Sequence, residues 1–146
     1  MDEPEARRRL SEARVARLAT IDERGRPHLV PFVFVLDGDT IYSPVDHKPK
    51  TTTRLQRLRN IERNPEATVL ADHYEEDWAK AWWVRARGRG RVLERRNPEF
   101  ARAETLLAEK YDQYRGAPAF GAVIAIDVAE WRGWSSAEGR PLHSSP

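Results

Sequence analysis

The feature that most constrains the fold is a series of short apolar runs, separated by tight turns, in the first third of the chain. Residues 15–21 and 27–36 are rich in β-branched and aromatic side chains, which favours extended strands. A turn with a glycine near its end, 22–26, lies between them, and Asp37-Gly38-Asp39 precedes a third run at 40–43. Three strands on tight turns predict an antiparallel meander.

The rest of the chain alternates helical and strand-like patterns. Proline after an acidic residue begins a short helix, three threonines can cap a second, and Asn97-Pro98-Glu99 is a typical start for a third. The predicted helices cover about 4–13, 51–64 and 97–116. The later predicted strands cover 67–74, 82–93 and 121–128, the last running on through Trp134. We therefore predict a mainly β (α+β) fold, a small barrel of six antiparallel strands, with helices at the N-terminus, after strand three and after strand five.

Length and composition exclude several classes of protein. The 146 residues suit a single domain over 1–146, with an ordered core at about 5–134 and a polar tail at 135–146. The absence of cysteine excludes disulfides, thiolate metal sites and cysteine nucleophiles. The acidic N-terminus does not resemble a signal peptide, and no apolar run approaches the roughly 18 residues of a membrane span. We expect a cytoplasmic protein.

Basic residues concentrate in one segment although the net charge is only +2. Of the 25 basic residues four are lysines, and Lys48 and Lys50 lie directly before the predicted helix that starts at Thr51 and Thr52. Ammonium groups beside the free N–H groups of a helix start form an anion site, and phosphate is the natural ligand. The alternative is a solvated basic surface helix.

A second basic segment alternates arginine with small residues between Arg85 and Arg91. On a strand the arginines share one face, which is typical of a solvated strand and also compatible with binding nucleic-acid phosphates. The glycines between them, Gly88 and Gly90, let another backbone, a partner subunit or a flat ligand approach closely. Because the net charge is nearly balanced and 75–77 are acidic, we expect no nucleic-acid partner.

The side chains themselves offer little reactive chemistry. The four histidines show no metal-ligand spacing, and no hydrolytic triad or phosphate-binding glycine motif is present, so we predict no metal. An enzyme of this composition would depend on a bound cofactor.

Four blocks of sequence together resemble one family. These are the hairpin at 19–31, the segment from Ile41-Tyr42-Ser43 to His47-Lys48-Pro49-Lys50, the helix end at 58–67, and the strand at 84–90. They are similar to the pyridoxamine 5′-phosphate oxidase-like superfamily over about residues 5–134. Within it, the pairing of 47–53 with Asp72-His73-Tyr74 and 82–85 resembles the branch that uses the deazaflavin coenzyme F420. The C-terminal pattern of a true pyridoxamine phosphate oxidase is not evident.

The resemblance implies a split β-barrel, a homodimer and a cofactor bound across the dimer interface. It implies that Lys48, Lys50 or Arg57 takes the cofactor phosphate, that His28 and Pro31 lie near the ring, and that Trp83 covers the ring from the partner chain. His73 and Tyr74 are candidate proton donors, with a structural role as the alternative. The residues expected to bind the cofactor are His28, Pro31, Ser43, His47, Lys48, Lys50, Thr51, Thr52, Arg57 and Trp83.

The functional hypothesis is therefore an F420-dependent oxidoreductase that transfers hydride between the deazaflavin and a small organic substrate. The alternatives are an FMN-binding oxidoreductase of the same fold, a protein that carries or binds F420 without catalysis, and a nucleic-acid binder.

Overall fold

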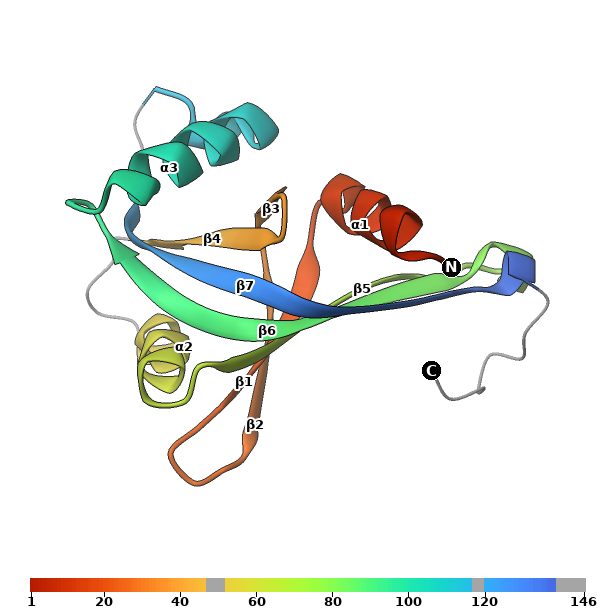
Figure 1. The fold of residues 1–146 in the computed structure, drawn as a ribbon, viewed down its shortest axis with the longest axis horizontal. Helices are drawn as coiled ribbons and strands as arrows, with labels where there is room; N and C mark the ends of the chain where they lie inside the picture. Colours follow the sequence, from red (N-terminus) through yellow and green to blue (C-terminus); the bar gives the residue numbers. More distant parts are fainter. Residues whose placement is uncertain (47–51, 117–119, 139–146) are drawn as a thin grey trace.

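The strands form one antiparallel sheet whose two edges are consecutive in the chain (Figure 1). The structure is a computed structural model that describes residues 1–46, 52–116 and 120–138. Within these residues the sheet has seven strands in the order β2-β1-β5-β6-β7-β4-β3. Their bounds are β1 Ala16–Ile21, β2 Pro27–Phe32, β3 Val35–Asp37, β4 Thr40–Asp46, β5 Glu66–His73, β6 Trp82–Glu94 and β7 Phe120–Ser135. The sheet curls into a split β-barrel, as predicted.

The prediction of six strands was wrong in one place, because the second run divides into β2 and β3. β2 pairs with β1, whereas β3 pairs with β4 at the opposite edge of the sheet. Val33 and Phe34 carry the chain from one edge to the other, and side chains satisfy their backbone. Ser43 Oγ donates to the Val33 carbonyl at 2.9 Å. The Tyr111 hydroxyl accepts from the Phe34 N–H at 3.2 Å and lies 2.9 Å from the Phe34 carbonyl.

The third helix starts at its predicted cap, Asn97, and the first starts at Asp2, a cap that was not predicted. In α1 (Glu3–Glu12), Asp2 accepts from the N–H of Glu5, and in α3 (Pro98–Lys110), Asn97 accepts from the N–H of Glu99. The helix after β4 is α2 (Thr52–Arg63). Short 3₁₀ turns follow the main elements: η1 Trp78–Lys80, η2 Asp112–Tyr114 and η3 Ser136–Glu138.

The third helix is shorter than predicted. It ends at Lys110, and Tyr111 leaves it to bond the β2–β3 crossing, while Tyr114 lies in η2. Arg14 and Lys110 cover the ring of Tyr111, with the Arg14 Cζ 4.7 Å and the Lys110 Nζ 5.3 Å from its centroid. Tertiary contacts therefore end this helix before the glycine at 116 that the sequence suggests.

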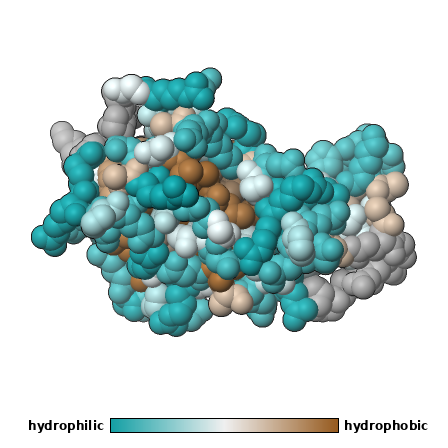
Figure 2. Space-filling view, turned by 45° about the horizontal axis from the view of Figure 1, so that its top comes forward, coloured by the Kyte–Doolittle hydropathy of each residue, from teal (hydrophilic) through white to brown (hydrophobic). Residues whose placement is uncertain are grey.

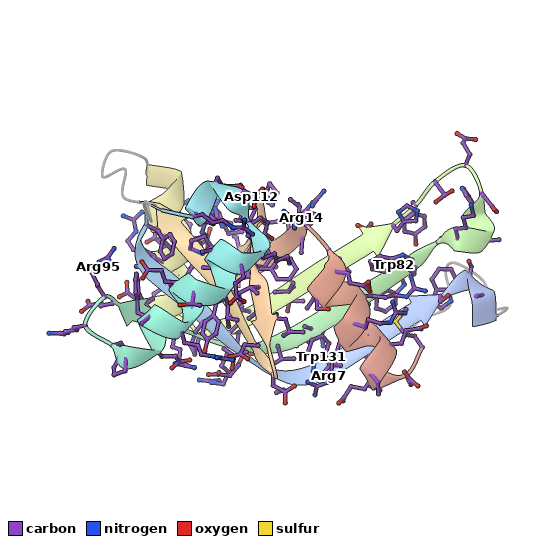
Figure 3. The ribbon with its side chains drawn as sticks, turned by 90° about the horizontal axis from the view of Figure 1, so that it is seen from above. Arg7, Arg14, Trp82, Arg95, Asp112 and Trp131 are labelled. Carbon is purple, nitrogen blue, oxygen red and sulfur yellow. The ribbon has the colours of Figure 1, made fainter. Side chains whose placement is uncertain are left out.

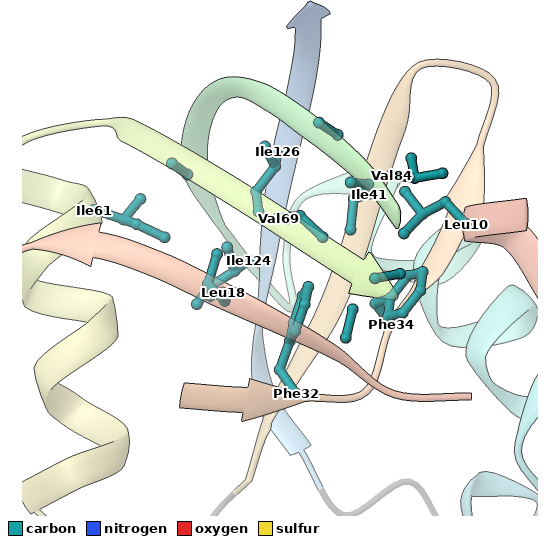
Figure 4. Packing of buried hydrophobic residues seen from close by; sticks show 14 of the residues in the cluster. Leu10, Leu18, Phe32, Phe34, Ile41, Ile61, Val69, Val84, Ile124 and Ile126 are labelled. Atoms are coloured by element: carbon teal, nitrogen blue, oxygen red, sulfur yellow. The ribbon is translucent and has the colours of Figure 1, made fainter. Parts of the chain in front are cut away.

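Two hydrophobic clusters hold the fold together. The first fills the barrel between the curled strands, with α1 covering one end of it (Figure 4). The second lies between α3 and the outside of β4 and β7. Residues 123–126 of β7 are buried on both faces for this reason, which explains their continuous apolar run. Ile61 projects from α2 toward Leu18 and closes the other end of the barrel (Figure 4).

At the two glycines of β6, other parts of the same chain fill the space that a side chain would take. A Cβ on Gly88 would lie 2.1 Å from the Asp127 carbonyl oxygen, where β6 and β7 shift register. A Cβ on Gly90 would lie 2.9 Å from Ile61 Cγ2. The sequence suggested that a backbone, a partner subunit or a flat ligand approaches these glycines. In the structure, the backbone of β7 lies against Gly88, and the side chain of Ile61 from α2 lies against Gly90.

Most arginines of the second basic segment, between Arg85 and Arg91 on β6, are paired with carboxylates. Arg89 pairs with Glu66 at 2.9 Å, Arg87 lies 3.8 Å from Glu130, and Arg91 binds Glu99 at 2.7 Å. These contacts fit the solvated-strand interpretation. On the face in Figure 2, hydrophobic residues gather in a recess beside α3 and are surrounded by hydrophilic ones. No helix in the described residues is long and apolar enough to cross a membrane.

Candidate functional site

A hollow of about 250 Å³ opens where the β2–β3 crossing, β4, α2 and η2 meet. Its walls are mostly apolar, with one guanidinium, one hydroxyl and one phenol among them. The residues that line it are Val15, Pro31, Phe32, Val33, Ser43, Pro44, Arg57 and Tyr114.

Three residues expected to bind the cofactor meet in this hollow: Pro31, Ser43 and Arg57. Pro31 lies on the edge strand β2, where a residue without an N–H is tolerated, and its ring is exposed on the outer face. Ser43 comes from the middle of β4, and Arg57 comes from the second turn of α2. Segments far apart in sequence thus supply one apolar recess with a cation at its wall.

Ser43 also has a structural task. Its side chain is buried, and its single proton is used in the bond to the Val33 carbonyl, so a ligand would meet only the lone pairs of this hydroxyl. The bond fixes the crossing that forms one side of the hollow.

A model of the pyridoxamine 5′-phosphate oxidase family matches residues 2–135, which is nearly the whole chain. The chain belongs to this family. No curated protein matches it significantly. Among solved structures, a conserved hypothetical protein of Mycobacterium tuberculosis superposes with a TM-score of 0.76 at 20% identity, covering 100% of this chain and 92% of that one.

Two further members of this fold differ in what their names say they bind. An FAD-binding protein of Mesorhizobium loti has a TM-score of 0.69 at 19% identity, covering 91% of this chain and 94% of that one. A heme storage protein of Vibrio cholerae has a TM-score of 0.66 at 19% identity, covering 89% and 92%. At such identities these likenesses establish the fold shared with the oxidase family.

Several predicted site residues of this oxidase-family chain are not placed in the hollow. His47, Lys48, Lys50 and Thr51 lie outside the described residues, and Thr52 is the first residue of α2. His28 lies on the opposite face of β2 from Pro31, in register with Thr20. Its Nδ1 is shielded and has no hydrogen-bond partner in the structure.

The other aromatic candidates lie on β5, directly after it and on β6, and none is among the residues that line the hollow. Trp83 faces the outside of the barrel, with the Arg85 Cζ 5.5 Å from its ring centroid. His73 stacks on Trp82 at 6.4 Å and binds Glu75, which lowers the pKa of that carboxyl. Tyr74 is half exposed. Within one chain, none of these three reaches the residues that line the hollow.

The sequence interpretation missed part of this wall. Tyr114 reaches the hollow because its ring packs edge-on against Tyr111 and Phe120, with centroids 6.1 Å and 5.5 Å away. Val15 reaches it because the α1–β1 connection passes beside the crossing. A signal was present for Val33, since residues 32–36 lack the alternation of a single strand.

A charged cluster on the other face of β4 steadies the strand that presents Ser43. Tyr42 donates to Glu99 at 2.6 Å, and Arg91 binds both Glu99 and Asp127 through paired hydrogen bonds. Arg91, and then Tyr42, lower the pKa of Glu99, whereas burial and Glu99 raise the pKa of Tyr42. This Arg91 cluster is fully paired and ties β4, β6, β7 and α3 together (Figure 3 shows the side chains around α3). In the part of the chain that is described, no group of acidic and histidine side chains could hold a metal ion.

Proposed function

We propose that this member of the pyridoxamine 5′-phosphate oxidase family is an oxidoreductase that uses coenzyme F420. It would transfer hydride between the deazaflavin and a small organic substrate. The observation that carries the proposal is the convergence of Pro31, Ser43 and Arg57 in one hollow, whose lining is partly apolar and partly polar. Three residues that the sequence motifs predict to bind a cofactor thus share one wall.

The chemistry of the hollow fits a flat ring that carries a phosphate. Val15, Phe32 and Val33 offer apolar surface that excludes water from a ring, and Arg57 offers a guanidinium that pairs with phosphate oxygens. When bound, F420 supplies the hydride, so the protein needs to bind and orient the reactants. Lys48, Lys50, Thr51 and Thr52 are proposed as the further phosphate ligands, next to the start of α2.

We also propose that two copies of the chain form the site. Large apolar side chains remain exposed on the outer face of β1, β2 and β5: Leu29 is 68% exposed and Leu70 is 37% exposed. Val15, at 45%, lines the hollow, and Arg17 lies between it and the two leucines on the same face. Trp83, on the outer face of β6, would approach the ring from the second copy. His73 and Tyr74, the proposed proton donors, would also come from that copy.

Cofactor titration tests the proposal. F420 and FMN are titrated separately into the purified protein while intrinsic tryptophan fluorescence is followed. We expect micromolar or tighter binding of F420. The variant Arg57→Ala should weaken it about tenfold or more, because a charge-assisted bond to phosphate is lost. Arg59→Ala is the matched control, since Arg59 is exposed on the same helix and bonds Gln56.

The second candidate is an oxidoreductase that binds FMN in place of F420. An FAD-binding protein of the same fold favours it, because its cofactor contains the FMN moiety. Tight FMN binding with no F420 binding would replace F420 in the proposal. F420 binding with no hydride transfer to any of a panel of quinones, nitroaromatics and enones would favour a carrier.

A further inference from the structure

Helix α2, which presents Arg57, is attached to the barrel by its second half. Ile61 is buried against Gly90, and Leu58 packs on the same cluster. Arg63 donates to the carbonyl of Ile21 at 3.3 Å. Apolar contacts of this kind are not directional, so they restrict a roll of the helix about its axis less sharply than a buried hydrogen bond does.

One polar contact in this interface is fully buried. Asn60 is fully buried, and its Nδ2 donates to the hydroxyl of Thr20, 2% exposed on β1, at 3.0 Å. Its Oδ1 accepts from Gln56 Nε2 at 2.7 Å and from Arg63 at 3.3 Å. A buried amide that lost its partner would carry an unsatisfied donor, so rolls that break this contact are penalised.

Arg57 and Asn60 are three residues apart, which places them on neighbouring faces of the same helix. A roll of about 20° would move a side chain some 6 Å from the helix axis by about 2 Å. That is several times the tolerance of about 0.5 Å within which binding groups must be held. The roll of α2 therefore decides whether Arg57 meets a ligand in the hollow.

We propose that the Asn60–Thr20 hydrogen bond sets the roll of α2 and so positions Arg57 in the hollow. Thr20 is then a positioning residue for the anionic group of the ligand, although it does not line the hollow. This inference rests on the proposed function in so far as Arg57 binds the phosphate. The bond itself is a property of the protein without ligand.

The test compares Thr20→Val, which keeps the shape and removes the acceptor, with Thr20→Ser, which keeps the hydroxyl. Two readouts are taken: the orientation of α2 on the barrel in a crystal structure of each variant without ligand, and the Kd for FMN and for F420. We expect Thr20→Val to turn α2 measurably about its axis and to raise the Kd at least fivefold. Thr20→Ser should leave both readouts close to those of the wild type. A merely structural role would lower the Tm and leave the Kd unchanged.

A double-mutant cycle then shows whether Thr20 acts through Arg57. In an Arg57→Ala background, Thr20→Val should have no further effect on the Kd, and a full additional loss would overturn the proposal. An unchanged orientation of α2 in Thr20→Val would also overturn it, whether or not a ligand binds. A turned α2 in a protein that binds neither FMN nor F420 would support the role of the bond in the roll and refute the proposed function alone.

Discussion

At the scale of single residues, several positions hold the fold together because they let distant parts of the chain pack closely. Gly88 admits the carbonyl of Asp127, and Gly90 admits the side chain of Ile61. Lys110 is half-buried, its Nζ donates to the Ala13 carbonyl at 2.7 Å, and it lies 4.1 Å from the Phe34 ring centroid. These residues join distant segments without touching the hollow.

Gly88→Ala should lower the free energy of unfolding by about 3 kcal/mol, because the new methyl group meets backbone that cannot turn aside. Gly90→Ala is the comparison and should cost less, since its methyl group meets the side chain of Ile61, which can shift more readily than backbone. Urea denaturation measures both. Equal losses in the two variants would contradict the assignment.

The lowered pKa of Lys110 leads us to expect that the protein becomes more stable as the pH rises. Burial, and then Arg14, lower its pKa to about 8, below the value near 10.4 of an unfolded chain. Between these values the unfolded chain binds more protons, so stability increases as the pH rises from 8 to 10. Relative to Lys110→Met, the wild type should therefore gain Tm over this range. Lys80→Met, at an exposed lysine, should show no such difference.

At the scale of elements, the cap of α3 and most strands could be predicted from sequence. Asn97-Pro98-Glu99 begins a helix, and the turns with Gly25 and Gly38 join strands, because these signals are local. The β2–β3 crossing and the early end of α3 could not be predicted. Both depend on Tyr111, whose hydroxyl bonds a backbone 77 positions away.

The same distinction holds for the site. Pro31, Ser43 and Arg57 were expected from the resemblance of short motifs, and the structure brings them together. Tyr114 and Val15 were missed, because they enter the hollow only through packing between elements.

The Arg91 cluster predicts a stability loss in acid. Arg91 lowers the pKa of Glu99 and of Asp127 below their ordinary values, so their contribution to stability is present at neutral pH and is lost as the pH falls through the lowered pKa values. Glu99→Gln should cost about 2 kcal/mol at pH 7 and progressively less toward pH 3. Glu94→Gln, in an exposed pair with Arg96, is the control and should cost little at either pH. A loss for Glu99→Gln that does not depend on pH would contradict this.

At the scale of the whole molecule, one face of the sheet exposes large apolar side chains without a helix over them. α1 covers one end of the barrel and α3 packs on β4 and β7, whereas Leu29 and Leu70 stay exposed on the outer face of β2 and β5. We propose that two copies of the chain meet at this face.

The double variant Leu29→Glu/Leu70→Glu should convert a dimer into a monomer and weaken cofactor affinity, because charges would be placed on the proposed interface. Light scattering after size exclusion measures the mass, and fluorescence titration measures the affinity. Trp78→Glu is the control, since Trp78 is 63% exposed on η1 and outside this face. A variant that stays dimeric would refute the interface.

The sequence separation of the paired strands also has a consequence for the order of folding. β1–β2 and β3–β4 are local hairpins, whereas the β4–β7 seam joins residues as far apart as Thr40 and Asp127, 87 positions away. Distant pairings bear the larger loop-closure entropy, so we expect this seam to close last. Ile41→Val, on the seam, should then accelerate unfolding and leave the refolding rate nearly unchanged in stopped-flow measurements. Until that final step, the β3–β4 hairpin would be separate from the sheet of the other five strands.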